Sequence, residues 1–403
     1  MDSAQTVQAV NSLTARWARG TAAREGTVLT AVGVWPLLAF LATGADQVVR
    51  RELEEAVGAS AEQAVGPARD LLATLDRLPE TGAALSVWTA ADLLLEPGWV
   101  AGLPPGTHGL LTGDPVSDAA RLDGWADRST GGMIRRMPLT PRPDTRLVLA
   151  GALTVRTRWL HPFRSAWVCP ESGPWIHQEL AGLALAVPLE QLPDALSLAE
   201  TSVGPVTELR LPGTGDIDVH LLLGPERADL GDVLTVGLDL LAGRHRRIPA
   251  AALPDGTPGP GLRIRQQLDT RPADRLSVTT VPFSLGAEHD LLATAPLFGL
   301  DAATGRSAHG FTGISPAELL IVSEARQTAT ATFGAAGFEA GAVTAVGMTR
   351  GSGGSVAQHR VRHVQVDFDR PFAFLAVHRP SGLALAAGWH TVPEPYLGTE
   401  DDD

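Results

Sequence analysis

The chain has 403 residues, of which 44% are hydrophobic and 19% are charged, and its formal net charge at pH 7 is −13. This share of hydrophobic residues predicts a folded protein with a sizeable core and excludes a largely disordered chain. The negative net charge argues against nucleic acid and anionic membranes as partners, because phosphate groups are bound by basic surfaces. The single cysteine, Cys169, excludes an intramolecular disulfide framework, so the core must supply the stability.

No targeting or membrane segment is visible in the sequence. The N-terminus lacks the basic segment, the uninterrupted apolar core and the cleavage site of a secretory signal peptide. The most apolar run, residues 28–42, contains Pro36 and is shorter than the roughly 20 residues that span a bilayer. We therefore expect a soluble protein without a membrane segment and with a cytoplasmic location.

The first third of the chain is predicted to be rich in helices. Apolar residues recur at helical spacing within residues 7–17, and the run at 28–42 is apolar on nearly all sides, which is typical of a buried helix. Charged residues and valines segregate to opposite faces within residues 46–57. A further helix is expected at residues 61–78, followed by a short strand at 83–88.

Strands predominate after residue 145. Residues 145–159 form a long run of Leu, Val and Ala that is apolar on both alternate faces, as in a strand at the centre of a covered sheet. Residues 318–333 end in alternating Thr and Ala, which predicts a strand with one polar or small face. Shorter strands between Gly and Pro turns are expected at residues 206–211, 217–223, 262–264 and 276–283.

The C-terminal part has the clearest pattern. Residues 363–377 and 383–389 are apolar segments with Arg-Pro-Ser-Gly at 379–382 between them, which predicts a buried antiparallel hairpin. Helices early in the chain and strands later predict an α+β fold with antiparallel sheets. The sequence shows neither an internal repeat nor a domain boundary.

At this hairpin the sequence resembles the serpins, a family of serine protease inhibitors. It looks like a bacterial-type member of that family. Residues 368–389, FDRPFAFLAVHRPSGLALAAGW, are similar to the C-terminal signature of the family, with Ala373 where a larger apolar residue is usual. Similar blocks occur in family order: VLTAVGVWPLLAFLATGA at 28–45, STGGMIRRMP at 129–138, LVLAGALTVRTRWLHPF at 147–163 and FTGISPAELLIVSEARQTATATF at 311–333.

The resemblance implies one serpin-like domain over residues 1–403. Its helix-rich N-terminal part would pack on a large mixed or antiparallel sheet, with further antiparallel sheets and an exposed reactive loop. The core is expected at about residues 7–395, the reactive loop at about 337–363 and an acidic tail at 398–403.

The resemblance also implies that the protein is not an enzyme but a suicide substrate. A serine protease attacks the exposed loop, and once the acyl-enzyme has formed, the cleaved loop inserts as a new strand of the main sheet and distorts the protease. The energy comes from adding a strand, so the native state is metastable. The nucleophile, base and oxyanion hole belong to the protease. We expect a monomer that needs no cofactor and no metal.

Small residues dominate the first half of the expected loop. Every second side chain of an inserting strand must enter the core, so small residues pass while bulk slows insertion. The usual family spacing places the scissile bond near Arg350-Gly351, where the arginine suits a trypsin-like protease, whereas Met348 would suit an elastase- or subtilisin-like one. The resemblance assigns the hinge to Gly337, Phe338, Glu339, Ala340, Gly341, Ala342, Val343, Thr344 and Ala345.

Some positions depart from the family pattern. Phe338 stands where inhibitory members usually have Thr or Ser, and a large side chain at the first inserted position would slow closure until the protease deacylates. This leaves two alternatives open: a non-inhibitory serpin-fold binding or storage protein, and a simple protease substrate. Trp159 is assigned to the breach, the region where the sheet opens. The shutter positions beneath the insertion point, occupied by two serines, an asparagine and a histidine in the family, are here Thr30, Gly33, Gly151 and Gln327.

Other interpretations have less support. On its own, the segment 337–363 would be a linker as readily as a functional loop. His359 and His363 have i,i+4 spacing, but upstream Gly and Ser argue against a helix and no acidic or Cys partner is near, so a metal site is not expected. Residues 305–310 contain Ser and His without the strand-turn-helix context of a nucleophile elbow, which argues against a hydrolase. The family resemblance adds an extracellular location as an alternative.

Overall fold

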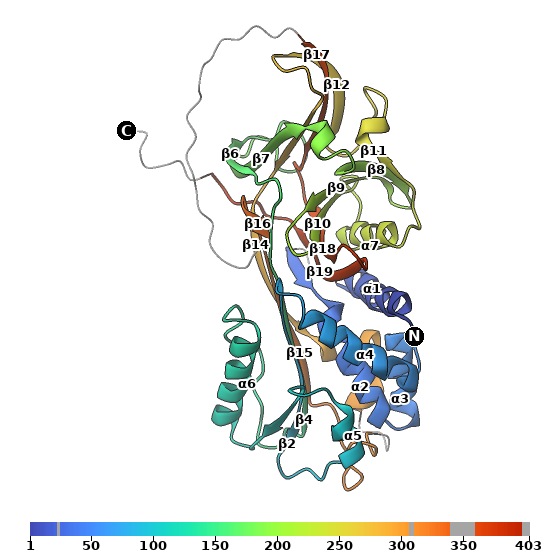
Figure 1. Cartoon of the computed structure of the whole chain (residues 1–403). Helices are drawn as coiled ribbons and strands as arrows, with labels where there is room; N and C mark the ends of the chain where they lie inside the picture. The colour runs from blue at the N-terminus through green and yellow to red at the C-terminus, as the bar shows by residue number, and fades with distance from the viewer. Residues whose placement is uncertain (22–24, 306–309, 339–358, 397–403) are drawn as a thin grey trace, which may run out of the picture.

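The computed structural model describes residues 1–21, 25–305, 310–338 and 359–396. A long sheet runs through the lower half of the molecule, with helices of the N-terminal part on one side and α6 (Pro115–Ser129) on the other (Figure 1). We call the face covered by α6 the outer face of this sheet and the opposite one the inner face. Two further sheets lie beyond its upper end (Figure 1).

The N-terminal helices confirm the sequence analysis, with one correction. The run at 28–42 is buried as expected, but it is not one helix. Val28 and Leu29 pair with β19 (Leu383–His390), and Pro36 lies in the first turn of α2, the only part of a helix where a residue without an N–H fits well. The bounds are α1 Ser3–Gly20, β1 Thr27–Leu29, η1 Ala31–Gly33, α2 Trp35–Gly44, α3 Gln47–Val57 and α4 Ala61–Leu75.

The long sheet is mixed rather than purely antiparallel. Its strand order is β3-β2-β4-β15-β16-β5, and β14 pairs with β15 on the side away from the others. The pairs β2–β3 and β4–β15 are parallel. The predicted strand at 145–159 is interrupted at Arg156. The bounds are β2 Thr81–Ala90, β3 His108–Leu111, β4 Leu147–Val155, β5 Thr157–Arg158, β14 Phe283–Asp290, β15 Glu324–Phe333 and β16 Gly337–Phe338.

Both faces of this sheet are covered by apolar side chains. The inner face belongs to the main core, which continues into the N-terminal helices and the hairpin of β18 and β19. A smaller core lies between the outer face and α6, built from residues such as Trp88, Leu122, Ala126 and Val148. Burial on both faces explains why residues 147–155 are apolar without alternation.

Two further sheets complete the fold. One has the order β1-β19-β18-β10-β9-β8-β11 and the other β12-β17-β13-β7-β6. Their bounds are β6 Arg164–Val168, β7 Leu180–Pro188, β8 Leu196–Thr201, β9 Gly204–Pro212, β10 Ile217–Leu223, β11 Arg247–Pro249, β12 Leu262–Asp269, β13 Arg275–Thr280, β17 His359–Asp367 and β18 Phe372–His378. The remaining helices are α5 Pro97–Gly102, η2 Leu189–Gln191, α7 Leu230–Leu241, η3 Ala250–Ala252, η4 Leu291–Phe298 and α8 Asp301–Thr304.

Two strand predictions need correction, and a proline lies at each break. The expected strand at 276–283 is two strands, β13 and β14, separated at Pro282. The expected hairpin arm at 363–377 belongs to β17 up to Asp367 and to β18 only after Pro371. Proline has no N–H to donate to a neighbouring strand, which explains why pairing stops at both places. The hairpin itself is confirmed, because β18 pairs antiparallel with β19.

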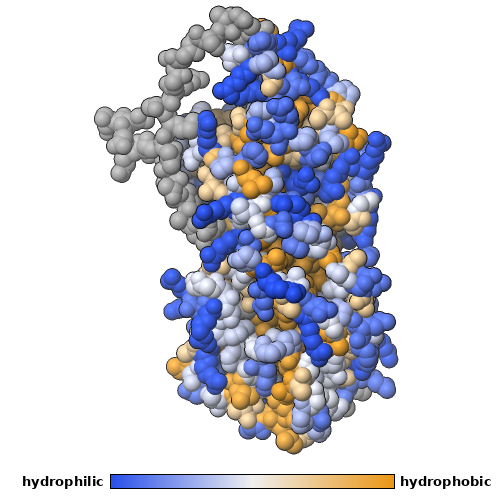
Figure 2. All heavy atoms as spheres, viewed as in Figure 1, coloured by the Kyte–Doolittle hydropathy of each residue, from blue (hydrophilic) through white to orange (hydrophobic). Residues whose placement is uncertain are grey.

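The architecture is an α+β fold, as the sequence predicted. The surface is largely hydrophilic on the face seen in Figure 2, with hydrophobic surface gathered at its lower end. Leu94 and Leu319 are among the exposed large hydrophobic residues, with 65% and 57% of their area accessible. In the described part of the chain, every helix is too short or too polar to cross a bilayer.

Candidate functional site

The candidate site begins at the contact between β4 and β15, which we call the seam. The two strands run parallel, and their pairing extends from Val148↔Glu324 to Leu153↔Ala329. A strand running antiparallel to both could pair with each of them by ordinary antiparallel ladders. The seam is therefore one of two parallel contacts in this sheet, with β2–β3, where an antiparallel strand could pair with both neighbours.

A strand of that direction already starts at the upper end of the seam. In β16, Phe338 pairs antiparallel with Phe333 of β15 and with Thr157 of β5, the continuation of β4. A Cβ atom on Gly337 would collide with the carbonyl oxygen of Thr157, so this position requires glycine. The first two residues of the predicted hinge thus lie between the two halves of the sheet.

Trp159 holds the turn that leads from β15 into β16. Its indole N–H donates to the carbonyl oxygen of Gly334 at 2.8 Å, and its backbone N–H donates to Ala336 at 2.9 Å. The backbone N–H of Phe163 donates to the carbonyl oxygen of Ala335, also at 2.9 Å. Trp159 therefore lies at the upper end of the seam, and its role in the breach stays a prediction.

Phe338 is completely buried in an aromatic cluster, which we define as Phe283, Phe333, Phe338, Phe374 and His390. The ring of Phe338 lies 6.0 Å from that of Phe374, which lies 4.9 Å from that of Phe283. Phe283 stacks on Phe333 with a centroid distance of 5.4 Å. The large side chain at the start of the hinge is thus already in the core while the seam is closed.

His390 is an unusual member of the aromatic cluster. Its ring stacks on Phe283 at 5.1 Å, and neither ring nitrogen has a hydrogen-bond partner among the described residues. Burial lowers the pKa of His390 to about 4, because a charged imidazolium would lose its hydration there. The imidazole is consequently neutral at physiological pH.

The four predicted shutter residues lie together beneath the seam. Gln327 is fully buried; its Nε2 donates to the carbonyl oxygen of Thr30 at 2.6 Å, and its Oε1 accepts the N–H of Thr30 at 3.3 Å. Gly151 is the partner of Gln327 across the seam. A Cβ on Gly151 would lie 2.6 Å from the carbonyl oxygen of Gly33, so the main chains approach closely here. An uncharged amide therefore fastens β15 to the segment below.

The two faces of β15 match the alternation in its sequence. Ala329 and Ala331 are buried on the inner face, while Thr328, Thr330 and Thr332 follow one another on the outer face. The hydroxyl groups of Thr328 and Thr330 are buried and have no hydrogen-bond partner in the part of the chain that the structure describes. The inner face offers small side chains, and the outer face offers free hydroxyl groups.

Several predicted residues lie outside the described part of the chain. These are the expected scissile bond Arg350-Gly351, its alternative Met348, the acidic tail and the hinge residues 339–345. The ends of the expected loop need a correction: residues 337–338 form β16, and residues 359–363 belong to β17. The segment between the two strands is therefore shorter than the range 337–363.

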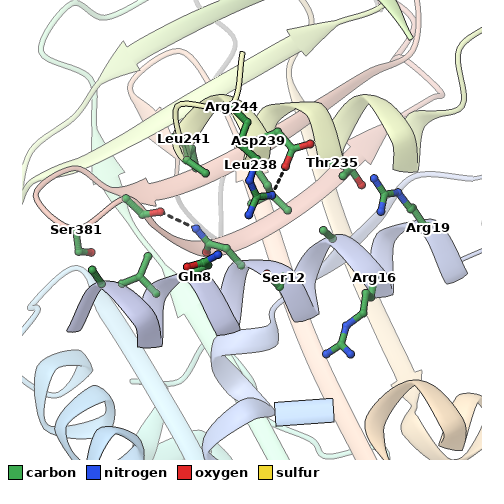
Figure 3. A pocket seen from close by; sticks show the side chains of 16 residues that line it. Gln8, Ser12, Arg16, Arg19, Thr235, Leu238, Asp239, Leu241, Arg244 and Ser381 are labelled. Carbon is green, nitrogen blue, oxygen red and sulfur yellow. Dashed lines mark hydrogen bonds and ion pairs between the residues drawn. The ribbon is translucent and has the colours of Figure 1, made fainter. Parts of the chain in front are cut away.

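A hollow of about 540 Å³ between α1 and α7 is separate from the seam (Figure 3). Asn11 of α1 joins it to the turn before β19: its Nδ2 donates to the carbonyl oxygen of Gly382 at 2.9 Å, and its Oδ1 accepts the N–H of Ala384 at 3.0 Å. Arg244 pairs with Asp239 at 2.6 Å on the opposite wall. None of the residues predicted for function lines this hollow.

Sequence reasoning missed several residues that shape the entrance of the seam. Phe333 and Phe163 pack against Trp159, with centroid distances of 5.1 and 6.4 Å, and His390 lies behind them. The Thr-Ala alternation ends in an aromatic residue, Phe333, and this change in the pattern could have indicated that the strand enters a different packing environment there. Nothing in the local sequence distinguishes His390 from a surface histidine.

The chain is similar to proteins of one family. Residues 261–393 match the family model described as Serpin (serine protease inhibitor). Plasminogen activator inhibitor 1 of Neovison vison is 25% identical over 66% of this chain and 60% of its own length, and plasminogen activator inhibitor 2 of Homo sapiens is 26% identical over 68% and 60%. These alignments thus span about three fifths of the relatives. Plasminogen activator inhibitor 1 of Bos taurus is 24% identical over 90% of this chain and 86% of its own length.

Solved structures share the fold at lower identity. The native state of the thermophilic serpin tengpin has a TM-score of 0.71 at 15% identity and covers 96% of this chain and 93% of its own. Thyroxine-binding globulin in complex with thyroxine has a TM-score of 0.70 at 14% identity, with coverage of 96% and 99%. The chain thus shares the fold of these structures, and its residues 261–393 are similar to the serpins in sequence.

Proposed function

We propose that the protein inhibits a serine protease as a suicide substrate and that its cleaved loop enters the seam between β4 and β15. The observation that carries this proposal is β16, a strand already antiparallel to both neighbours at the upper end of the seam. Extension of β16 beyond Phe338 would continue two ladders that already exist. No new direction of the chain would be needed.

The register of β16 supports insertion along the whole seam. If β16 continued from Phe338 along β15, Thr344 would lie opposite Gln327. If it continued along β5 and β4, Thr344 would lie opposite Gly151. Gln327 and Gly151 are themselves partners across the closed seam. The two ladders therefore agree, and one strand could satisfy both neighbours without a bulge.

The side chains that would enter the core are small. In an inserted strand of the same alternation, the residues turned inward after Phe338 would be Ala340, Ala342, Thr344 and Val346. They would face a β15 surface that presents Ala329 and Ala331. Small groups on both partners reduce the overpacking that a new strand would cause in a filled core.

The position of Phe338 supports inhibition over the alternative of a simple substrate. Its ring is already in the aromatic cluster, so no large side chain has to cross the sheet at the first step.

A specific observation nevertheless favours a second candidate, a non-inhibitory binding or storage protein. The burial of Phe338 against Phe374 anchors the hinge in the native state, and this anchor resists any rearrangement that would pull it out.

We further propose a scissile bond at or near Arg350-Gly351 and a trypsin-like target, with Met348 and a subtilisin-like target as the alternative. An arginine before the cut complements a pocket that carries a buried carboxylate. The protein would act as a single domain and as a monomer, in the cytoplasm or outside the cell.

The experiment is incubation with a trypsin-like serine protease followed by boiling in detergent and electrophoresis. We expect a covalent complex heavier than the 42.2 kDa chain. Arg350→Ala should abolish the complex, whereas Arg360→Ala in β17 should leave it intact. Cleavage by the protease without any complex would contradict the proposal.

A Phe338→Thr variant tests whether the large side chain of Phe338 obstructs insertion of the loop. We expect it to destabilise the native protein by about 3–5 kcal/mol, because it empties a buried site, and to give no more complex than the wild type. A gain in complex would show that the bulk of Phe338 obstructs insertion.

A further inference from the structure

A second hollow of about 540 Å³ lies on the outer face of the long sheet. One wall comes from the segment after α6, with Gly131, Gly132, Met133 and Arg135, together with Arg156 at the end of β4. The other wall comes from β14 and β15, with Ser284, Gly286, Thr330 and Thr332 among its residues. The hollow therefore spans the seam, since its walls belong to opposite halves of the sheet.

The first wall is cationic. Arg135 and Arg156 form no ion pair with a carboxylate among the described residues. The Nε of Arg156 donates to the sulfur of Met133 at 3.0 Å, and that of Arg135 donates to the carbonyl oxygen of Gly132 at 3.4 Å. Both guanidinium groups keep further N–H donors available. Other described arginines, such as Arg136 and Arg158, also form no ion pair, but these two lie together in the lining of one hollow.

The second wall supplies hydroxyl groups. The Oγ1 of Thr330 is buried without a hydrogen-bond partner in the described part of the chain, which leaves a donor with nothing to bind. Ser284 and Thr332 share a hydrogen bond of 3.1 Å and retain acceptor and donor capacity. The nearest acidic side chain on β14 is Glu288, which lies one row further along the sheet, opposite Thr328.

We propose that this hollow binds a small phosphate-type oxyanion, either free phosphate or a phosphate monoester. Two guanidinium groups on one side and hydroxyl donors on the other suit a doubly charged tetrahedral anion. The volume leaves room for a small organic group beside the phosphate. A bound anion would bridge the segment 131–135 and Arg156 to β14 and β15, and would hold the seam closed.

Binding is tested by isothermal titration and thermal unfolding with inorganic phosphate and with glycerol 3-phosphate, at an ionic strength matched with chloride. We expect saturable binding and a rise in Tm. Arg156→Gln and Arg135→Gln should each weaken binding at least about tenfold, while Arg136→Gln, next to the hollow but outside its lining, should bind as the wild type does. Equal affinity for both ligands identifies phosphate as the recognised group, and preference for glycerol 3-phosphate identifies a monoester.

The Thr330→Val variant tests the unpaired hydroxyl. It replaces the hydroxyl by a methyl group of similar size, so we expect unchanged or raised Tm without ligand and weaker phosphate binding. The absence of saturable binding, or equal binding by the Arg135 and Arg136 variants, would overturn the site.

The effect on the seam rests on the proposed inhibitory function and needs a separate measurement. Saturating phosphate should slow formation of the detergent-stable complex in the wild type and leave its rate unchanged in Arg156→Gln. Equal rates with and without phosphate in the wild type would overturn the bridging role. A protein that forms no complex at all would contradict the inhibitory function, while the titration would still decide the phosphate site.

Discussion

At the scale of single residues, the burial of Phe338 could not be predicted from its position relative to the hinge glycine in the sequence. The resemblance placed it at the first inserted position, just after the hinge glycine Gly337, and predicted an obstacle to insertion. In the structure a turn at residues 334–337, held by Trp159, brings Phe338 back beside Phe333 and into the core. The sequence contains the residue type and the hinge glycine, but the fold of the turn depends on contacts with residues far away in the chain. The four residues that the resemblance assigned to the shutter, Gln327, Thr30, Gly33 and Gly151, lie together, and their role as a shutter stays a prediction.

His390 predicts a pH dependence of stability. Its pKa of about 4 in the folded protein lies below the ordinary value of 6.5, so the unfolded chain binds the additional proton as the pH falls from about 6.5 to about 4. The stability that neutral His390 provides is complete above pH 6.5 and is lost over that range, by up to about 3 kcal/mol.

The measurement is urea unfolding of the wild type and of His390→Phe at pH 7 and pH 4.5. We expect the wild type to lose more stability on acidification than His390→Phe, which keeps the stacking on Phe283 and cannot titrate. The exposed His359→Phe is the matched control and should behave as the wild type. An equally steep loss in wild type and His390→Phe would show that this buried imidazole does not titrate as described.

At the scale of elements, periodicity predicted the helices and the Thr-Ala strand, and it failed where proline or tertiary pairing ends an element. The run at 28–42 and the strand at 276–283 were each predicted as one element, because hydrophobicity continues through Pro36 and Pro282. The two-residue strand β16 could not be predicted, since its existence depends on pairing with both β5 and β15.

The β16 strand leads to a prediction with a matched control three residues away. Gly337→Ala should destabilise the protein by about 1–3 kcal/mol, because its Cβ would collide with the carbonyl oxygen of Thr157 and separate β16 from β5. A Cβ on Gly334 meets nothing within 4 Å, so Gly334→Ala should change stability by less than about 0.5 kcal/mol. Urea unfolding gives both values, and hydrogen exchange at Phe338 reports the strand directly. Equal effects of the two substitutions would argue against the β16–β5 pairing.

At the scale of the whole molecule, the sequence predicted the α+β class and, through resemblance, the serpin fold. It could not reveal that β4 and β15 are parallel neighbours, because strand pairing between segments so far apart leaves no local pattern. That parallel contact, with β16 beginning at its upper end, is the feature on which the inhibitory proposal depends. The relation of the seam to the hollow that spans it also emerges only at this scale.

The central claim is that the seam accepts the cleaved loop as a new strand. The most direct test is the Tm of the protein before and after cleavage at the loop. We predict a rise of about 10 °C or more, because a full additional strand contributes several kcal/mol, together with slower hydrogen exchange in β4 and β15. Ala342→Arg, which would turn a charge inward, should be cleaved without this rise, whereas Gly341→Arg, which points outward, should keep most of it. An unchanged or lower Tm after cleavage of the wild-type protein would contradict the account.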